Sequence, residues 1–350
     1  MRSMSACLGA CRTSPRHAPL AAGRTRQSDR LLLVLFIAAG LALATGAFAQ
    51  DAYPVRPVRL IVPYPTGGGA DIIGRIVAEK LSEQLGRQVI VDNRGGASTV
   101  IGAELAAKAP ADGYTLLVAT VTTLAVVPNI KSRLPYDYER DFTPISMLAT
   151  QPYVLVVHPS TAVTSVARLV AHAKAYPGKV DFGSPGTGSG GHIAGELFKS
   201  MTGINMIHIA YKGSGPSLTD LLGGHVFLVF STIAPVKPLV NDRRLRALAV
   251  TTAKRTAAMP EVPTVAESGV TGYESNSWNS LIAPKGTPAA ILKRLNSEVV
   301  AALRSPPVEK RLIAQGVDPE PGTPRQLDDY VKSQRARMAK LLKAMDLQGP

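Results

Sequence analysis

Two glycine-rich segments contain the residues of this sequence whose types and spacing could do chemistry. The stretch FGSPGTGSGGHIAGELF, residues 182–198, has Gly186, Gly188 and Gly191 in a G-x-G-x-x-G spacing between a short apolar run and a helical pattern. The stretch PYPTGGGAD, residues 63–71, has the same setting. Glycines at a strand-to-helix turn let the backbone approach a ligand closely, and the amides at a helix N-terminus favour anions. Each segment is therefore a candidate binding loop for a small anion.

A dinucleotide site is one interpretation of the second loop, and the residues around it argue against that interpretation. Such a site needs a carboxylate about 20 positions after the glycines, to bind the ribose hydroxyl. The corresponding residues, 206–211, include none. In the first loop Ile72 replaces the third glycine, and neither loop has the G-K-[ST] of a phosphate-binding loop. A nicotinamide-dependent oxidoreductase is thus a remote alternative, and no cofactor is expected.

Hydroxyl groups beside the glycines could donate hydrogen bonds to a carboxylate. Thr187 and Ser189 lie within the second loop, Ser184 just before it, and Thr66 precedes Gly67–Gly69 in the first. Neither loop contains lysine or arginine, so a carboxylate would be held by amides and hydroxyls and not by a salt bridge. Tight turns without a ligand remain the alternative for both loops.

Asp71 and His192 are titratable residues beside the loops, and each has two interpretations. Asp71 either caps the helix that starts near Ala70, or selects ligand amines and orders water in the cleft. His192 either contacts a ligand or makes a local cap or packing contact. The histidines show no H-x-x-x-H spacing, and neither a G-x-S-x-G elbow nor a pair of carboxylates stands out. The sequence predicts a binding protein with no metal site and no catalytic residue.

The elements that position these loops alternate between short apolar strands and longer helical patterns. VRLIV, residues 58–62, is the strand before the first loop, and KVDFG, residues 179–183, is the strand before the second. Further strands are predicted at 89–91, 115–119, 153–157, 206–210, 226–230 and 246–251. This alternation is typical of an α/β protein with mainly parallel sheets. Two strand–loop–helix units more than a hundred residues apart suggest two lobes that each offer one loop to a shared cleft.

The N-terminal residues have the pattern of an export signal. Three arginines, the last of them Arg30, precede an uncharged apolar run at 31–44, and Ala47-Phe48-Ala49 fits a cleavage site. This pattern is typical of a signal peptide over residues 1–49, cleaved near Ala49/Gln50. A membrane anchor is the less favoured alternative, because the run is shorter than the roughly 20 residues that span a bilayer.

Removal of this segment changes the charge and the cysteine content. Both cysteines, Cys7 and Cys11, lie in it, so the mature chain has neither a thiol nor a disulfide. Without its six basic and one acidic residue, the formal net charge falls from +14 to about +9. The remaining charges are scattered, with no basic block and no interleaved aromatics, so no nucleic-acid partner is expected.

Blocks of sequence spread over the mature chain resemble one known family. They include VDNRGGAS, LPYDYERDFTPISML, the loop at 182–198, AYKGSGPSLTDLLGGHV and PEVPTVAESG, in this order. Together they closely resemble the solute receptors of tripartite tricarboxylate transporters, also called Bug or TctC-type periplasmic receptors. The resemblance implies a two-lobed type II periplasmic binding protein, a Venus flytrap with two mixed, mostly parallel sheets. Lobe one would comprise 50–152 plus 278–350, and lobe two 153–277.

The resemblance also implies which residues bind the ligand. The segment after the strand at 115–119 and the segment after Phe230 face the cleft in such receptors, in addition to the two loops. The implied ligand-binding residues are Thr66, Gly67, Gly68, Gly69, Ala70, Asp71, Thr120, Thr122, Ser184, Gly186, Thr187, Gly188, Ser189, His192 and Ser231.

The function implied is that of an extracytoplasmic receptor, not an enzyme. It would bind a small organic carboxylate in the periplasm and deliver it to the integral membrane permease subunits of a tripartite transporter, most simply as a monomer. A sensory receptor coupled to a membrane signalling protein is the alternative. The ligand of a relative does not transfer, because Thr66, Ser231 and Asn279-Ser280 depart from the residues common in that family.

Overall fold

A computed structural model describes residues 53–345 and residue 347. These residues belong to one compact unit that begins at Tyr53. The predicted signal peptide, residues 1–49, and its cleavage site near Ala49/Gln50 lie outside the described residues.

Six of the described strands form sheet A. Their order is β2–β1–β3–β9–β4, with β10 also on β4, and β1 is parallel to β2 and β3 while β9 is antiparallel to β3 and β4. The bounds are β1 Val58–Val62, β2 Val89–Asn93, β3 Thr115–Thr120, β4 Phe142–Val157, β9 Asn276–Pro284 and β10 Asp318–Pro319.

Sheet B is built on the far end of the same long strand, β4. Residues Tyr153–Val157 of β4 pair antiparallel with β7 and residues Val154–Val157 with β8, while β5 is parallel to β6 and β7. The bounds are β5 Val180–Ser184, β6 Met206–Ala210, β7 Leu228–Thr232 and β8 Arg246–Val250. The α/β class with mixed sheets is confirmed. The expectation of mostly parallel sheets is wrong, because five of the nine strand pairs among the described residues are antiparallel. All five involve β4 or β9, and of these two long strands the sequence pattern predicts only residues 153–157 of β4.

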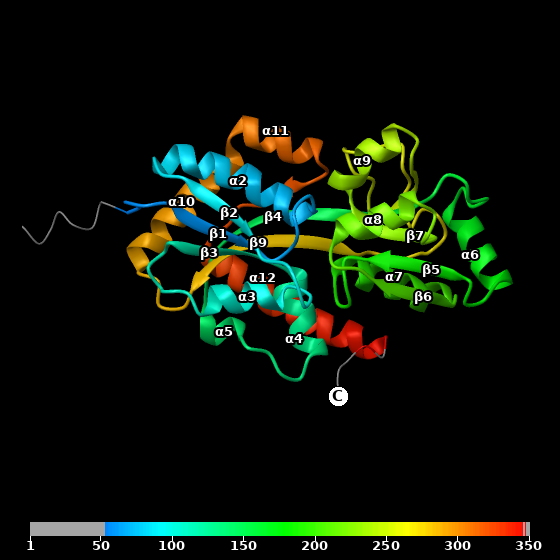
Figure 1. The fold of residues 1–350 in the computed structure, drawn as a ribbon, viewed down its shortest axis with the longest axis horizontal. Helices are drawn as coiled ribbons and strands as arrows, with labels where there is room; N and C mark the ends of the chain where they lie inside the picture. The colour runs from blue at the N-terminus through cyan, green and yellow to red at the C-terminus, as the bar shows by residue number, and fades with distance from the viewer. Residues whose placement is uncertain (1–52, 346, 348–350) are drawn as a thin grey trace, which may run out of the picture. The chain divides into compact units, whose positions relative to one another are not determined.

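Helices cover both faces of sheet A (Figure 1). One apolar cluster joins the strands to α2, α10 and α11, and another joins them to α3, the π-helix η1 and α12. Strand β1 shows why its sequence is continuously apolar: Leu60 and Val62 face the first cluster while Ile61 faces the second. The bounds are α2 Gly69–Leu85, α3 Val100–Ala107, η1 Thr122–Val126, α4 Val127–Ile130, α5 Tyr138–Asp141, α10 Ala289–Arg304, α11 Pro306–Ala314 and α12 Pro324–Ala344.

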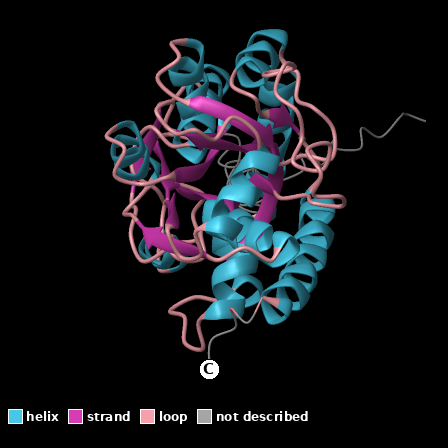
Figure 2. Cartoon of the chain, turned by 90° about the vertical axis from the view of Figure 1, so that its right-hand side faces the viewer, coloured by secondary structure: helices cyan, strands magenta, loops and turns pink. Residues whose placement is uncertain are grey.

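Sheet B is covered in the same way, and Figure 2 shows helices packed around the strands. One apolar cluster on this sheet includes residues of α6 and α7, and another includes residues of α8 and α9. The bounds are α6 Val166–Ala175, α7 Gly190–Thr202, α8 Ser214–Leu222 and α9 Ile233–Asn241. The division into lobes 50–152 plus 278–350 and 153–277 stays a proposal, which the change of sheet between Pro152 and Tyr153 supports.

Candidate ligand-binding site

A small cavity of about 50 Å³ lies where the two predicted loops meet. Elements of both sheets line it, and they belong to chain segments far apart in the sequence. The lining residues are Tyr64, Gly68, Gly69, Ala70, Thr120, Gln151, Tyr153, Pro185, Ser189, Gly190, Gly191, Ser214, Phe230, Ser231, Thr232, Ser277 and Asn279. Among these described residues none carries a charged side chain.

The N-terminal ends of four helices point their first residues at this cavity. Gly68 is the N-cap of α2, Ser189 the N-cap of α7 and Thr232 the N-cap of α9, while Ser214 is the first residue of α8. Each helix N-terminus has backbone N–H groups without helical partners and carries roughly half a positive charge. Four of them around one cavity favour an anion without any lysine or arginine.

Several side-chain atoms in the wall of the cavity are buried without a hydrogen-bond partner among the described residues. They are Gln151 Oε1, Ser231 Oγ, Thr232 Oγ1 and both amide atoms of Asn279. Buried polar atoms are normally paired, and each unpaired one costs about 1–3 kcal/mol. Both donors and acceptors are present in this set, so a bound polar molecule would satisfy them.

Gly69 shows why the first loop needs a glycine at the start of α2. A Cβ atom there would lie 2.7 Å from Gln151 Oε1 and 2.9 Å from Thr232 Oγ1. Both distances are far below van der Waals contact, so only glycine lets these two side chains approach the backbone. The loop thus brings the first turn of α2 against residues from both sheets.

Asp71 is buried in the first turn of α2 and braces the loop instead of lining the cavity. Its carboxylate accepts hydrogen bonds from Gly67 N at 2.9 Å, Asn93 Nδ2 at 2.9 Å and Arg75 Nε at 3.1 Å. Burial alone would raise the pKa of Asp71, but these hydrogen bonds outweigh it and hold the pKa below its ordinary value. The N-cap of α2 is Gly68, so Asp71 is not the N-cap that the sequence suggested.

The second loop leads into α7 through closely packed glycines. Ser189 Oγ accepts from His192 N at 3.4 Å and caps the helix. A Cβ atom on Gly190 would meet Tyr153 Oη at 1.6 Å, and one on Gly191 would meet the Phe230 carbonyl at 2.4 Å. These glycines press the first turn of α7 onto strands β4 and β7, at the wall of the cavity.

The structure brings together only part of the predicted site. Gly68, Gly69, Ala70, Thr120, Ser189 and Ser231 line the cavity. The other predicted residues do not line it: Thr66, Gly67, Asp71, Thr122, Ser184, Gly186, Thr187, Gly188 and His192.

Three of these residues face a different space. Thr187, Gly188 and His192 line a second cavity of about 440 Å³, together with Ser98 and Lys131. The Thr187 carbonyl accepts a hydrogen bond from Ser98 Oγ at 2.5 Å, which links this loop to the segment after β2. Between Thr187 and Ser189 the chain passes through Gly188 (φ +78°), and the two residues line different cavities.

Three wall residues were not among the individual ligand-binding residues that the sequence predicted. Gln151 lies at the crossing between the sheets, Thr232 follows Ser231, and Asn279 lies on the unpredicted strand β9. Asn279 carries a signal in the sequence as one of the departures from the residues common in the resembling family, and Thr232 lies in the segment after Phe230 that was expected to face the cleft. Gln151 becomes recognisable only through its packing against Gly69.

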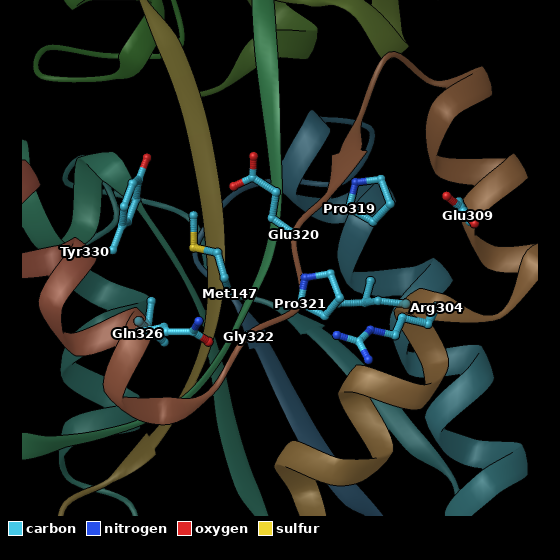
Figure 3. A pocket seen from close by; sticks show the side chains of 11 residues that line it. Met147, Arg304, Glu309, Pro319, Glu320, Pro321, Gly322, Gln326 and Tyr330 are labelled. Carbon is cyan, nitrogen blue, oxygen red and sulfur yellow. The ribbon is translucent and has the colours of Figure 1, made fainter.

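A larger cavity of about 560 Å³ lies away from the glycine loops (Figure 3). Figure 3 shows Arg304 of α10 and Glu309 of α11 on one side of it, and Gln326 and Tyr330 of α12 on the other. None of the unpartnered buried atoms among the described residues belongs to its wall. Its size alone therefore does not make it the better candidate for a specific site.

The chain is similar to known receptors over nearly its whole described length. A family model described as the tripartite tricarboxylate transporter family receptor, TctC, matches residues 73–347. Protein BugT of Bordetella pertussis is 39% identical over 311 residues, which cover 89% of this chain and 95% of BugT.

Two solved structures are similar in fold and sequence. R. palustris Rpa4515 with adipate is 40% identical, with a TM-score of 0.83 over 85% of this chain and 100% of that chain. MatC from Rhodopseudomonas palustris with bound malate is 26% identical, with a TM-score of 0.78 over 83% of this chain and 100% of that chain.

Within residues 53–345, no helix combines the length and the apolar character needed to cross a membrane. The resemblance drawn from the sequence blocks is confirmed by the family match and by these relatives. The chain belongs to the receptor family of tripartite tricarboxylate transporters.

Proposed function

We propose that this protein is an exported, monomeric periplasmic receptor that binds a small organic carboxylate between sheets A and B. It delivers the carboxylate to the permease subunits of a tripartite transporter and catalyses no reaction. The observation that carries the proposal is the convergence of four helix N-termini on a cavity whose wall contains unpartnered polar atoms. Adipate and malate, bound in the two similar structures, are carboxylates of the class proposed.

The chemistry of the wall suits a carboxylate better than a phosphate or a cation. A carboxylate oxygen accepts from amides and hydroxyls, which Gly69, Ser189, Ser231 and Thr232 offer. The described lining residues carry no charged side chain, so there is no carboxylate to bind an amine, and every carboxylate of the ligand is held by neutral donors. Asn279 and Gln151 can accept or donate, so they are suited to a neutral polar group elsewhere on the ligand.

Thermal unfolding of residues 50–350 with and without adipate, malate and adipamide tests the proposal. Adipamide keeps the length of adipate and removes both charges. A carboxylate at about a hundred times its Kd should stabilise the fold by roughly 2.7 kcal/mol, a clear rise in Tm, while adipamide should not. A ligand-free, folded protein that responds to no carboxylate would overturn the proposal.

Variants of the cavity wall test whether the carboxylate binds in this cavity. Ser231→Ala with Thr232→Val should weaken carboxylate binding by roughly 1–3 kcal/mol, because two hydroxyl partners are lost. Ser333→Ala on the exposed face of α12 is the matched control and should bind as the wild type does.

The transport role needs a separate test. The liganded receptor should be retained by membranes that contain the permease. Retention by a membrane signalling protein instead would favour the sensory alternative.

A further inference from the structure

A buried histidine and a half-buried one lie directly behind the second glycine loop. His192 of α7 and His208 of β6 have ring centroids 4.0 Å apart. The Phe182 ring lies against both, with centroid distances of 6.3 Å and 4.9 Å. Neither histidine lines the cavity assigned to the carboxylate, so neither is in a position to contact the ligand there.

Each histidine holds a different part of the loop. Gly188 N donates to His192 Nδ1 at 3.1 Å. His208 Nε2 lies 2.6 Å from Ser184 Oγ, and that hydroxyl accepts from Gly186 N and donates to the Gly186 carbonyl, both at 3.1 Å.

The contacts of His192 and His208 with the loop both lead to Ser189, the loop residue that lines the ligand cavity. The Gly186 carbonyl accepts from Ser189 N at 3.0 Å, and Ser189 Oγ in turn accepts from the backbone N of His192. Gly186 (φ +140°) and Gly188 (φ +78°) are in conformations open mainly to glycine. Glycine has more backbone freedom than other residues, so the hydrogen bonds from Ser184 and His192 restrict the conformation of this stretch.

We propose that His192 and His208, as neutral imidazoles, are positioning residues that hold the loop 184–189 so that Ser189 and the N-terminus of α7 face the carboxylate. This inference rests on the proposed function and adds to it the groups that set the geometry of the loop. His192 acts on Gly188 directly, and His208 acts on Gly186 through Ser184.

The neutral state of His192 follows from its hydrogen bond with Gly188. His192 Nδ1 accepts from an N–H group, so it carries no proton, and the proton lies on Nε2. A proton on Nδ1 would face the Gly188 N–H with a second donor and break this contact. His208 Nε2 donates to Ser184 when that hydroxyl donates to the Gly186 carbonyl.

The surroundings of the pair favour this neutral state. Burial, followed by the effects of His208 and Lys199, lowers the pKa of His192 to about 3. Burial, followed by the effect of Lys199, lowers the pKa of His208 to about 4. The acidic group near the histidine pair is Glu196, which lies 3.9 Å from His192 Nε2. Its carboxylate also pairs with Lys199 at 2.9 Å. Lys131, from the end of α4, lines the same second cavity as His192 and adds another positive charge there.

Two substitutions of His192 separate positioning from packing. His192→Asn can keep an oxygen acceptor near the position of Nδ1, whereas His192→Leu fills similar space without an acceptor. Calorimetric titration with adipate and with malate should show binding about tenfold weaker in His192→Leu, the order expected for one lost hydrogen bond, and near wild-type binding in His192→Asn. Ser184→Ala, which breaks the His208 connection, should weaken binding in the same direction.

A structural role alone predicts a different result, in which both His192 variants unfold at lower temperature and bind with unchanged Kd. That result would overturn the inference. A wild-type protein that binds neither probe would instead contradict the proposed function, and a second measurement then still tests the histidines. Nitrogen-15 spectra of the imidazoles at pH 7 should show His192 protonated on Nε2 and bare on Nδ1; a proton on Nδ1 would also overturn the inference.

Discussion

Asn279 shows at the scale of one residue how binding and stability oppose each other in the cavity. Its side chain is fully buried, and both amide atoms lack partners within the described residues. Leucine has a similar shape and needs no hydrogen bond. We therefore expect Asn279→Leu to raise the free energy of unfolding of the ligand-free protein by about 1 kcal/mol. The same change should weaken carboxylate binding at least about tenfold. Urea unfolding and calorimetric titration measure the two effects.

Asn296 provides the matched control, because its amide is already paired. Its Nδ2 donates to the carbonyls of Ile145 at 2.7 Å and Gly322 at 2.8 Å. Asn296→Leu should lower the free energy of unfolding by about 1–2 kcal/mol and leave the affinity unchanged. Similar losses of stability in both variants would show that Asn279 is paired in the free protein, and would remove its support for a polar ligand.

At the scale of one element, the carboxylate of Asp71 holds the start of helix α2 by hydrogen bonds. Asp71→Asn keeps the shape of the side chain but removes the charge that Gly67, Arg75 and Asn93 contact. A hydrogen bond to a charged group contributes about 1.5–3 kcal/mol. We expect the free energy of unfolding at pH 7 to fall by about the value of one such bond, 1.5–3 kcal/mol. Thermal unfolding of wild type and variant measures the difference.

The pH dependence of this difference has a definite sign. Because the folded state holds the pKa of Asp71 below its ordinary value of 3.8, the stability is present above 3.8 and is lost as the pH falls through the lowered pKa. Wild type and variant should therefore converge in strongly acidic solution. Glu104→Gln, which breaks an exposed pair between α3 and its C-cap residue Lys108, is the control and should change stability by less than about 0.5 kcal/mol. An equally small effect of Asp71→Asn would refute the bracing role.

At the scale of the whole molecule, Ile193 connects a helix of sheet B with the core of sheet A. It lies on α7, which packs on sheet B, yet its buried side chain belongs to the apolar cluster on sheet A that includes Leu124 and Trp278. Ile193→Ala should lower the free energy of unfolding by about 2–4 kcal/mol. It should also weaken carboxylate binding about tenfold, because the arrangement with both loops at the ligand becomes less populated.

Leu221 is the control for this prediction. Its side chain is fully buried in a cluster made of sheet B residues and the helices α8 and α9. Leu221→Ala should cost comparable stability without affecting the Kd for adipate or malate. If calorimetry finds the same Kd in both variants, contact of Ile193 with sheet A does not contribute to ligand capture.

The limits of sequence reasoning follow from the same elements. The pattern predicts the strand at 58–62 with its observed bounds, because each of its faces is buried and its residues are apolar throughout. The strand predicted at 153–157 is the end of the 16-residue β4. Strand β9 is not predicted at all, since Asn276-Ser277 and Asn279-Ser280 resemble a loop although most of these residues are buried.

The sequence by itself determined the α/β class, the family, and the two strand–loop–helix turns rich in glycine. Each of these follows from the order and pattern of residues along the chain and needs no contact between distant segments. Only the tertiary structure decided that Gln151, Thr232 and Asn279 face the cavity while Thr187 and His192 face away from it. Whether a buried polar atom finds a partner depends on how β4, β7 and β9 lie against one another. These strands come from distant segments, and β4 and β9 are more than a hundred residues apart. No local pattern contains that information.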